Sequence, residues 1–120
     1  MKFYNYLNES KYIPDKIIDE LKKDRSHWKN IKKDLRLPIV QKGEYLGYGN
    51  PQDCEGNTKK FVKNNPNALK FEGYLIWYDK DNYEWKVVHH TFPVMYNKVM
   101  EVTPLEDKWD ENTYYIGKKK

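Results

Sequence analysis

The chain has one cysteine, Cys54, and its surroundings suit covalent chemistry. Asn50, Pro51 and Asp53 precede it and predict a helix start, with Asn50 as N-cap, Pro51 in the first turn and Asp53 as a capping-box acid. A thiol in the first turn faces unpaired backbone N–H groups and the positive end of the helix dipole, which both stabilise the thiolate. Because the thiolate is the nucleophile, Cys54 is a candidate catalytic residue. The simpler interpretation is a buried cysteine acting as a small apolar side chain.

A thiol nucleophile needs a base, and that base needs an orienting partner. The sequence offers three histidines. His27 lies in an amphipathic segment and is interpreted as a surface residue. His89 and His90 are neighbours on a predicted strand, so they point to opposite faces and cannot both serve one site. The same geometry argues against a zinc site, which requires several converging ligands.

The turn after this strand decides which histidine meets a carboxylate. A two-residue turn at Tyr96 and Asn97 puts Glu101 on the same face as His90, at a diagonal within reach of its side chain. A three-residue turn would put Glu101 on the face of His89 instead. We favour His90, and the apolar neighbours of Glu101 argue against a solvated surface carboxylate.

The elements that must position these residues follow from hydrophobic spacing. Residues 1–37 are typical of one or two amphipathic helices, ended by Pro38. Their apolar stripe comprises Ile17, Ile18, Leu21, Trp28, Ile31 and Leu35. A membrane-surface helix is the alternative, weakened by six acidic residues between Glu9 and Asp34. Residues 39–50 are expected to be extended and then loop-like.

The rest of the chain predicts one helix followed by strands. The helix is expected from Asn50 to about Lys63, with Cys54, Thr58, Phe61 and Val62 on one face. Alternating residues then predict strands over 69–77, 85–94 and 99–103, in an antiparallel meander. Together these elements predict an α+β fold in a single domain, 1–120, in which a Cys-bearing helix packs on a sheet of three or more strands. Residues 105–120 are expected to form an aromatic tail.

The order of these chemical residues resembles the core of transglutaminase-like proteins, within the broader papain-like cysteine enzymes. In that family a Cys opens the central helix, a His-x-Trp strand follows, and an Asp-Pro-Thr strand completes a triad. The matching segments, within residues 50–104, are Cys54, Glu72-Gly73-Tyr74, His90-Thr91-Phe92 and Glu101-Val102-Thr103-Pro104. This sequence departs from the pattern at Phe92, Glu101 and Val102, which stand for Trp, Asp and Pro.

The resemblance implies acyl transfer by a Cys54–His90–Glu101 triad on a protein, peptide or other amide substrate. Cys54 would attack the carbonyl to form a thioester, His90 would act as acid and base, and Glu101 would hold the imidazole. Gln52 and Tyr74 are the candidate oxyanion or binding residues. No cofactor or metal is expected. Peptidase, amidase, deamidase and transglutaminase activities all remain open.

The composition of the chain weighs against several other classes of function. Of the net charge of +4, Lys118, Lys119 and Lys120 contribute three, and Arg25 and Arg36 are the only arginines, which weighs against specific nucleic-acid binding. A single cysteine excludes an internal disulfide and a multi-cysteine metal site. No apolar run is long enough to span a membrane and no signal peptide is evident, so a cytoplasmic location in a bacterial or host cell is expected.

The alternative function is a non-catalytic protein-binding module or inhibitor, of the kind encoded by a phage or other mobile element. This chain would then carry a degenerate copy of the triad. Exposed aromatic side chains would supply the contacts, since Tyr and Trp are enriched at protein interfaces. The candidates are Tyr74, Trp77, Tyr78, Tyr83 and Trp85. Their ordinary interpretation is core packing and cross-strand pairing.

Overall fold

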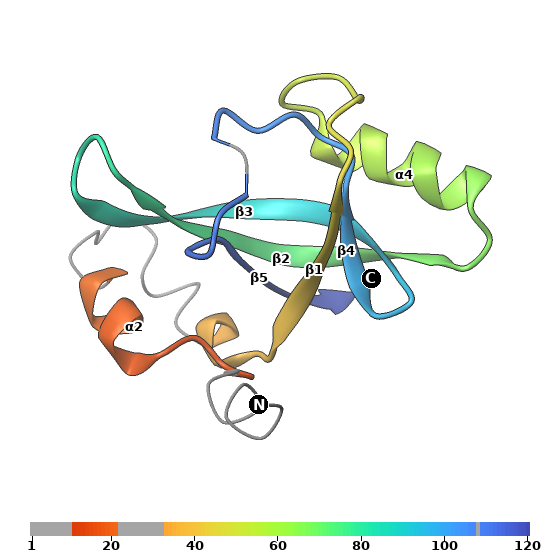
Figure 1. Ribbon diagram of the computed structural model, residues 1–120. Helices are drawn as coiled ribbons and strands as arrows, with labels where there is room; N and C mark the ends of the chain where they lie inside the picture. The colour runs from red at the N-terminus through yellow and green to blue at the C-terminus, as the bar shows by residue number, and fades with distance from the viewer. Residues whose placement is uncertain (1–10, 22–32, 108) are drawn as a thin grey trace, which may run out of the picture.

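Five strands close into a barrel in the computed structural model, which describes residues 11–21, 33–107 and 109–120. The elements in chain order are α2 (Asp15–Leu21), the 3-10 helix η1 (Asp34–Arg36), β1 (Ile39–Tyr45), α4 (Cys54–Asn64), β2 (Ala68–Asp79), β3 (Glu84–Met95), β4 (Lys98–Glu101) and β5 (Tyr114–Lys119). Figure 1 shows α4 against one side of the barrel and α2 at the opposite side.

The strand order around the barrel is β1-β4-β3-β2-β5. β2, β3 and β4 form the antiparallel meander, and β5 pairs antiparallel with both β2 and β1. The parallel pair β1–β4 completes the ring. The predicted α+β fold is therefore wrong: among the described residues the protein is mostly sheet, a closed barrel with two short helices rather than a papain-like core.

Of the two strands that close the ring, β1 lies in the segment expected to be extended, although it was not placed in the sheet, and β5 was not predicted. Residues 39–45 form β1, and the predicted tail contains β5. Tyr115 and Ile116 of β5 are both fully buried, so the strand lacks the alternation of a half-exposed edge. Gly73 lets β5 approach closely, since a Cβ there would lie 2.0 Å from the Ile116 carbonyl oxygen.

The core divides into an interior cluster and two outer clusters, because successive residues of a strand face opposite sides. The barrel interior holds Leu75, Phe92, Val94, Val99 and Tyr115. Outside it, α2 and η1 bury Ile13, Ile17, Ile18, Leu21 and Leu35 against Tyr74, Ile76 and Ile116. A third cluster joins α4 to the barrel through Phe61, Ala68 and Val102.

The helices differ from their expected bounds. In the predicted helical region 1–37, the described residues form only α2 and η1, and His27, Trp28 and Ile31 lie outside the described residues. The helix expected from Asn50 begins at Cys54 instead, and Asp53 is its N-cap, accepting a hydrogen bond from the Gly56 N–H at 3.1 Å. Gln52 has φ of +62°, which breaks the helix before the cap.

The described residues contain no helix with the length and apolar character needed to cross a membrane.

Candidate functional site

Cys54 is the first residue of α4, so its thiol stands at the N-terminus of a capped helix of 11 residues. The helix is tied to β3 by a hydrogen bond from Thr58 Oγ1 to the Thr91 carbonyl oxygen, 3.3 Å long. Thr58 is fully buried, and it lies one turn after Cys54 on the same face of the helix. This contact holds the Cys54 end of α4 against the strand that carries His90.

A second tie runs through Asn57, whose buried side chain bridges three segments. Its Nδ2 donates to the Asn50 carbonyl oxygen at 2.8 Å and to Thr103 Oγ1 at 2.9 Å. Its Oδ1 accepts from the Asn50 N–H at 2.9 Å. The loop before Cys54, the helix itself and the segment after Glu101 are therefore held together by one amide.

The turn between β3 and β4 is the two-residue one, with Met95 paired to Lys98. Its central residues, Tyr96 and Asn97, have φ of +54° and +65°, values typical of a tight hairpin turn. With this register His90, rather than His89, meets Glu101: His90 Nε2 lies 2.6 Å from Glu101 Oε1.

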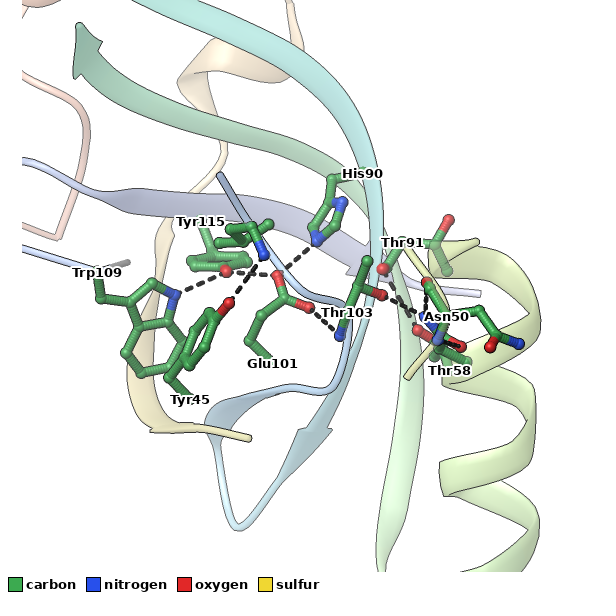
Figure 2. Close-up of polar contacts among 11 residues, drawn as sticks. Tyr45, Asn50, Thr58, His90, Thr91, Glu101, Thr103, Trp109 and Tyr115 are labelled. Carbon is green, nitrogen blue, oxygen red and sulfur yellow. Dashed lines mark hydrogen bonds and ion pairs between the residues drawn. The ribbon is translucent and has the colours of Figure 1, made fainter. Parts of the chain in front are cut away.

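Glu101 is fully buried and is surrounded by donors. Besides His90, its Oε1 accepts from the Tyr115 hydroxyl at 2.6 Å, and its Oε2 accepts from the Thr103 N–H at 3.2 Å. The indole N–H of Trp109 donates in turn to the Tyr115 hydroxyl at 2.9 Å, as Figure 2 shows. A buried carboxylate is tolerated only when such partners replace water. This network fixes the carboxylate and, through it, one edge of the imidazole.

The pKa values of Cys54 and His90 move in opposite directions. Polar interaction with the His90 side chain is the largest cause that lowers the pKa of Cys54, and the backbone of Thr91 also lowers it, against partial burial. Burial alone would lower the pKa of His90, but interactions with Cys54 and Glu101 outweigh burial and raise it to about 9. These opposite shifts favour a thiolate–imidazolium pair at neutral pH. Since Glu101 binds Nε2, Nδ1 is the imidazole nitrogen left for Cys54.

The pair opens into a cavity of about 730 Å³. Cys54 and His90 line it together with Gln52 and Thr103. The structure thus brings Cys54, His90, Glu101 and Gln52 to one place. Cys54 is half-buried while Glu101 is fully buried, so the thiol is accessible and the carboxylate is not.

Tyr74 is not part of this group. Its side chain faces the opposite side of β2, where its hydroxyl lies 3.2 Å from Asp34 Oδ2 and its ring packs on His89. It is buried in the outer cluster under α2 and does not line the Cys54 cavity. Strand alternation explains this, because the cavity side of β2 is that of Leu75.

The aromatic residues considered for protein binding do not form one exposed patch. Tyr83 alone among them is strongly exposed, at 83%. Trp77 and Tyr78 line the cavity, and Trp85 packs on Tyr78 and on Tyr114 of β5. Among the described residues no group of His, Cys, Asp and Glu could hold a metal ion.

Sequence reasoning missed Tyr115, Trp109 and Asn57. Tyr115 and Trp109 lie in the segment taken for a tail, and no local spacing links them to Glu101. Asn57 sits on the same helical face as Cys54, three residues on, so its polar side chain on the buried face was a usable signal.

Comparisons of this chain with protein-family models, with curated proteins and with solved structures gave no match. The likeness to transglutaminase-like proteins therefore stays a prediction.

Proposed function

We propose that the protein is a cysteine-dependent acyl-transfer enzyme that acts on an amide carbonyl through Cys54, His90 and Glu101. The observation that carries this proposal is the polarised pair at the mouth of a cavity: a thiol with lowered pKa beside an imidazole with a pKa raised to about 9. Such opposite shifts at one accessible site are typical of catalytic groups. A structural role for Cys54 would require neither the buried Glu101 nor its donors.

The reaction begins with attack of the Cys54 thiolate on the carbonyl carbon, which forms the C–S bond of a tetrahedral intermediate. The first-turn backbone N–H of Cys54, with the Gln52 side chain, stabilises the oxyanion. The His90 imidazolium protonates the amide nitrogen as the C–N bond breaks, leaving a thioester and a free amine. Water or a second amine then attacks the thioester, gives its proton to His90 and releases the thiolate as the C–S bond breaks.

Glu101 has a positioning role in this scheme, because it touches His90 and is closed off from the cavity. Its charge stabilises the imidazolium, and its bond to Nε2 fixes the plane of the ring. The Tyr115 hydroxyl and the Thr103 N–H hold the carboxylate in turn.

The first experiment measures alkylation of Cys54 by limiting iodoacetamide at neutral pH, with mass spectrometry. We expect Cys54 to react at least about tenfold faster than free cysteine, because more of it is thiolate. His90→Ala should remove this advantage. His89→Ala is the matched control, since His89 is the neighbouring histidine on β3 and also lines the cavity, and it should leave the rate unchanged.

The second experiment tests acyl transfer itself with p-nitrophenyl acetate. A burst of p-nitrophenol together with an acetyl group on Cys54 is expected, followed by slow turnover. Cys54→Ala should abolish both. If Cys54 reacts like free cysteine and forms no acetyl adduct, the enzyme proposal is wrong, and a biological effect that survives Cys54→Ala would identify a binding protein instead.

A further inference from the structure

The cavity beside Cys54 is acidic although the protein is basic. Asp81, Glu106, Asp107 and Asp110 line it, against a single ammonium group, that of Lys80. The whole chain has the opposite balance, with 22 Lys and Arg against 18 Asp and Glu. The cavity therefore concentrates negative charge that the rest of the surface does not share.

The protein neutralises one of these carboxylates in part, that of Asp110, because the Lys42 ammonium binds the Asp110 carbonyl oxygen and is influenced by the Asp110 charge. Lys80 Nζ lies 3.7 Å from Asp110 Oδ2, a long and exposed pair. Within the described part of the chain no ion pair is made by Asp81, Glu106 or Asp107. Lys86 senses the charge of Glu106, but its ammonium is bound to Asp79 at 3.0 Å.

Part of the cavity lining is apolar. Leu75, Trp77, Val88 and Leu105 line it next to the acidic residues. A lysine or arginine side chain matches this combination, because its methylene stem packs on apolar surface while its charged end stays with carboxylates. Trp77 also lines the cavity, and a tryptophan ring is a good partner for a guanidinium or ammonium group. An acidic substrate side chain would meet like charge in the same place.

We propose that the substrate of this site is an amide flanked by a basic side chain, lysine or arginine, which lies in the acidic cavity while the carbonyl reaches Cys54. This inference rests on the proposed acyl transfer. Asp81, Glu106, Asp107 and Asp110 are its specificity-determining residues, and the opposing charge of Lys80 is paired to Asp110.

The test uses three reagents that differ in one side chain: the N-iodoacetyl derivatives of arginine amide, norleucine amide and glutamic acid amide. The alkylation rate of Cys54 by each is measured at low salt and divided by the rate of N-acetylcysteine with the same reagent. Arginine should be favoured over glutamic acid by about tenfold, the lower end of what charged clefts achieve. The preference should shrink at high salt, because exposed charges are screened.

The double variant Glu106→Gln, Asp107→Asn should lose most of the arginine preference. The control is Glu44→Gln, Glu84→Gln, which removes the same charge from exposed residues that do not line the cavity, and it should keep the preference. Equal normalised rates for the three reagents, or a preference that the double variant retains, would overturn the inference. Failure of the proposed function appears separately, as a norleucine reagent that reacts with Cys54 no faster than with N-acetylcysteine.

Discussion

His90 Nε2 and Glu101 Oε1 lie 2.6 Å apart in the interior, on two strands joined by a two-residue turn. The short turn matters because it fixes which histidine faces the carboxylate. Because Glu101 takes Nε2, the second imidazole nitrogen, Nδ1, is the one left for Cys54. A helix residue and two strand residues are thereby connected through a single ring.

Replacing Glu101 by Gln should slow alkylation of Cys54 at neutral pH by about tenfold, which equals roughly 1.4 kcal/mol in the stability of the ion pair. The reason is that the His90 imidazolium loses the negative charge of Glu101 and becomes less stable. The Cys54 thiolate in turn loses the positive charge that stabilises it. The pH dependence of the iodoacetamide rate measures this, with a midpoint shifted to higher pH in the variant. An unchanged midpoint would show that Glu101 does not act on Cys54 through His90.

The raised pKa of His90 predicts how stability depends on pH. A group whose pKa is raised by folding stabilises the protein fully below its unfolded value of 6.5 and loses that effect as the pH rises through about 9. The loss attributable to His90 is on the order of 3 kcal/mol. Urea unfolding across this window should show it in the wild type and much less in His90→Gln. If the free energy of unfolding depended on pH in the same way in the two proteins, the raised pKa of His90 would be contradicted.

Tyr115→Phe should cost about 1–3 kcal/mol of folding free energy. The substitution removes a donor from the buried Glu101 and leaves the Trp109 N–H without its acceptor. Denaturant unfolding measures the loss. Tyr83→Phe is the control, because Tyr83 is 83% exposed, and it should change stability by less than about 0.5 kcal/mol. Equal losses of folding free energy in the two variants would argue against a stabilising role of the hydrogen bonds among Glu101, Tyr115 and Trp109.

Asn57→Ala should both destabilise the protein, by about 1–3 kcal/mol, and loosen the placement of Cys54. It removes the bonds to Asn50 and Thr103 that hold the helix start against the segment after β4. Hydrogen exchange of the first turn of α4 should rise, and the alkylation advantage of Cys54 should fall. Asn67→Ala is the control, since Asn67 is exposed and its side chain donates to the Tyr96 hydroxyl at 3.0 Å. Protection of the first turn that stays unchanged in Asn57→Ala would refute the role of this bridge.

The strands that carry the site could be predicted because their signals are local. Alternation marks β2 and β3, and the residues Tyr96 and Asn97 mark the turn that sets the register. The observed start of α4, Cys54, is later than expected because the N-cap is Asp53 rather than Asn50. The N-terminal stripe of Ile17, Ile18 and Leu21 does form a buried helical face.

The closed barrel could not be predicted in the same way. β1 joins the ring through a parallel pair with β4, and β5 joins it through antiparallel pairs with β1 and β2. These pairings span long stretches of chain, for which a single sequence carries no spacing signal. The contact of Glu101 with His90 could be predicted from the length of the hairpin turn. The contact of Tyr115 with Glu101 could not, because it forms only when β5 closes the barrel. The acidity of the cavity was also hidden, because Asp81 and Asp110 are far apart in the sequence and meet only in the fold.

The position of Tyr115 on β5 makes the site depend on the last strand of the barrel. Cys54, His90 and Glu101 all precede β5, which supplies the hydroxyl donor to the carboxylate. A chain shortened to end at Pro104 would hold all three residues yet lack the strand that seals Glu101 from water. The thiol would acquire its reactive state only when β5 is docked beside Gly73.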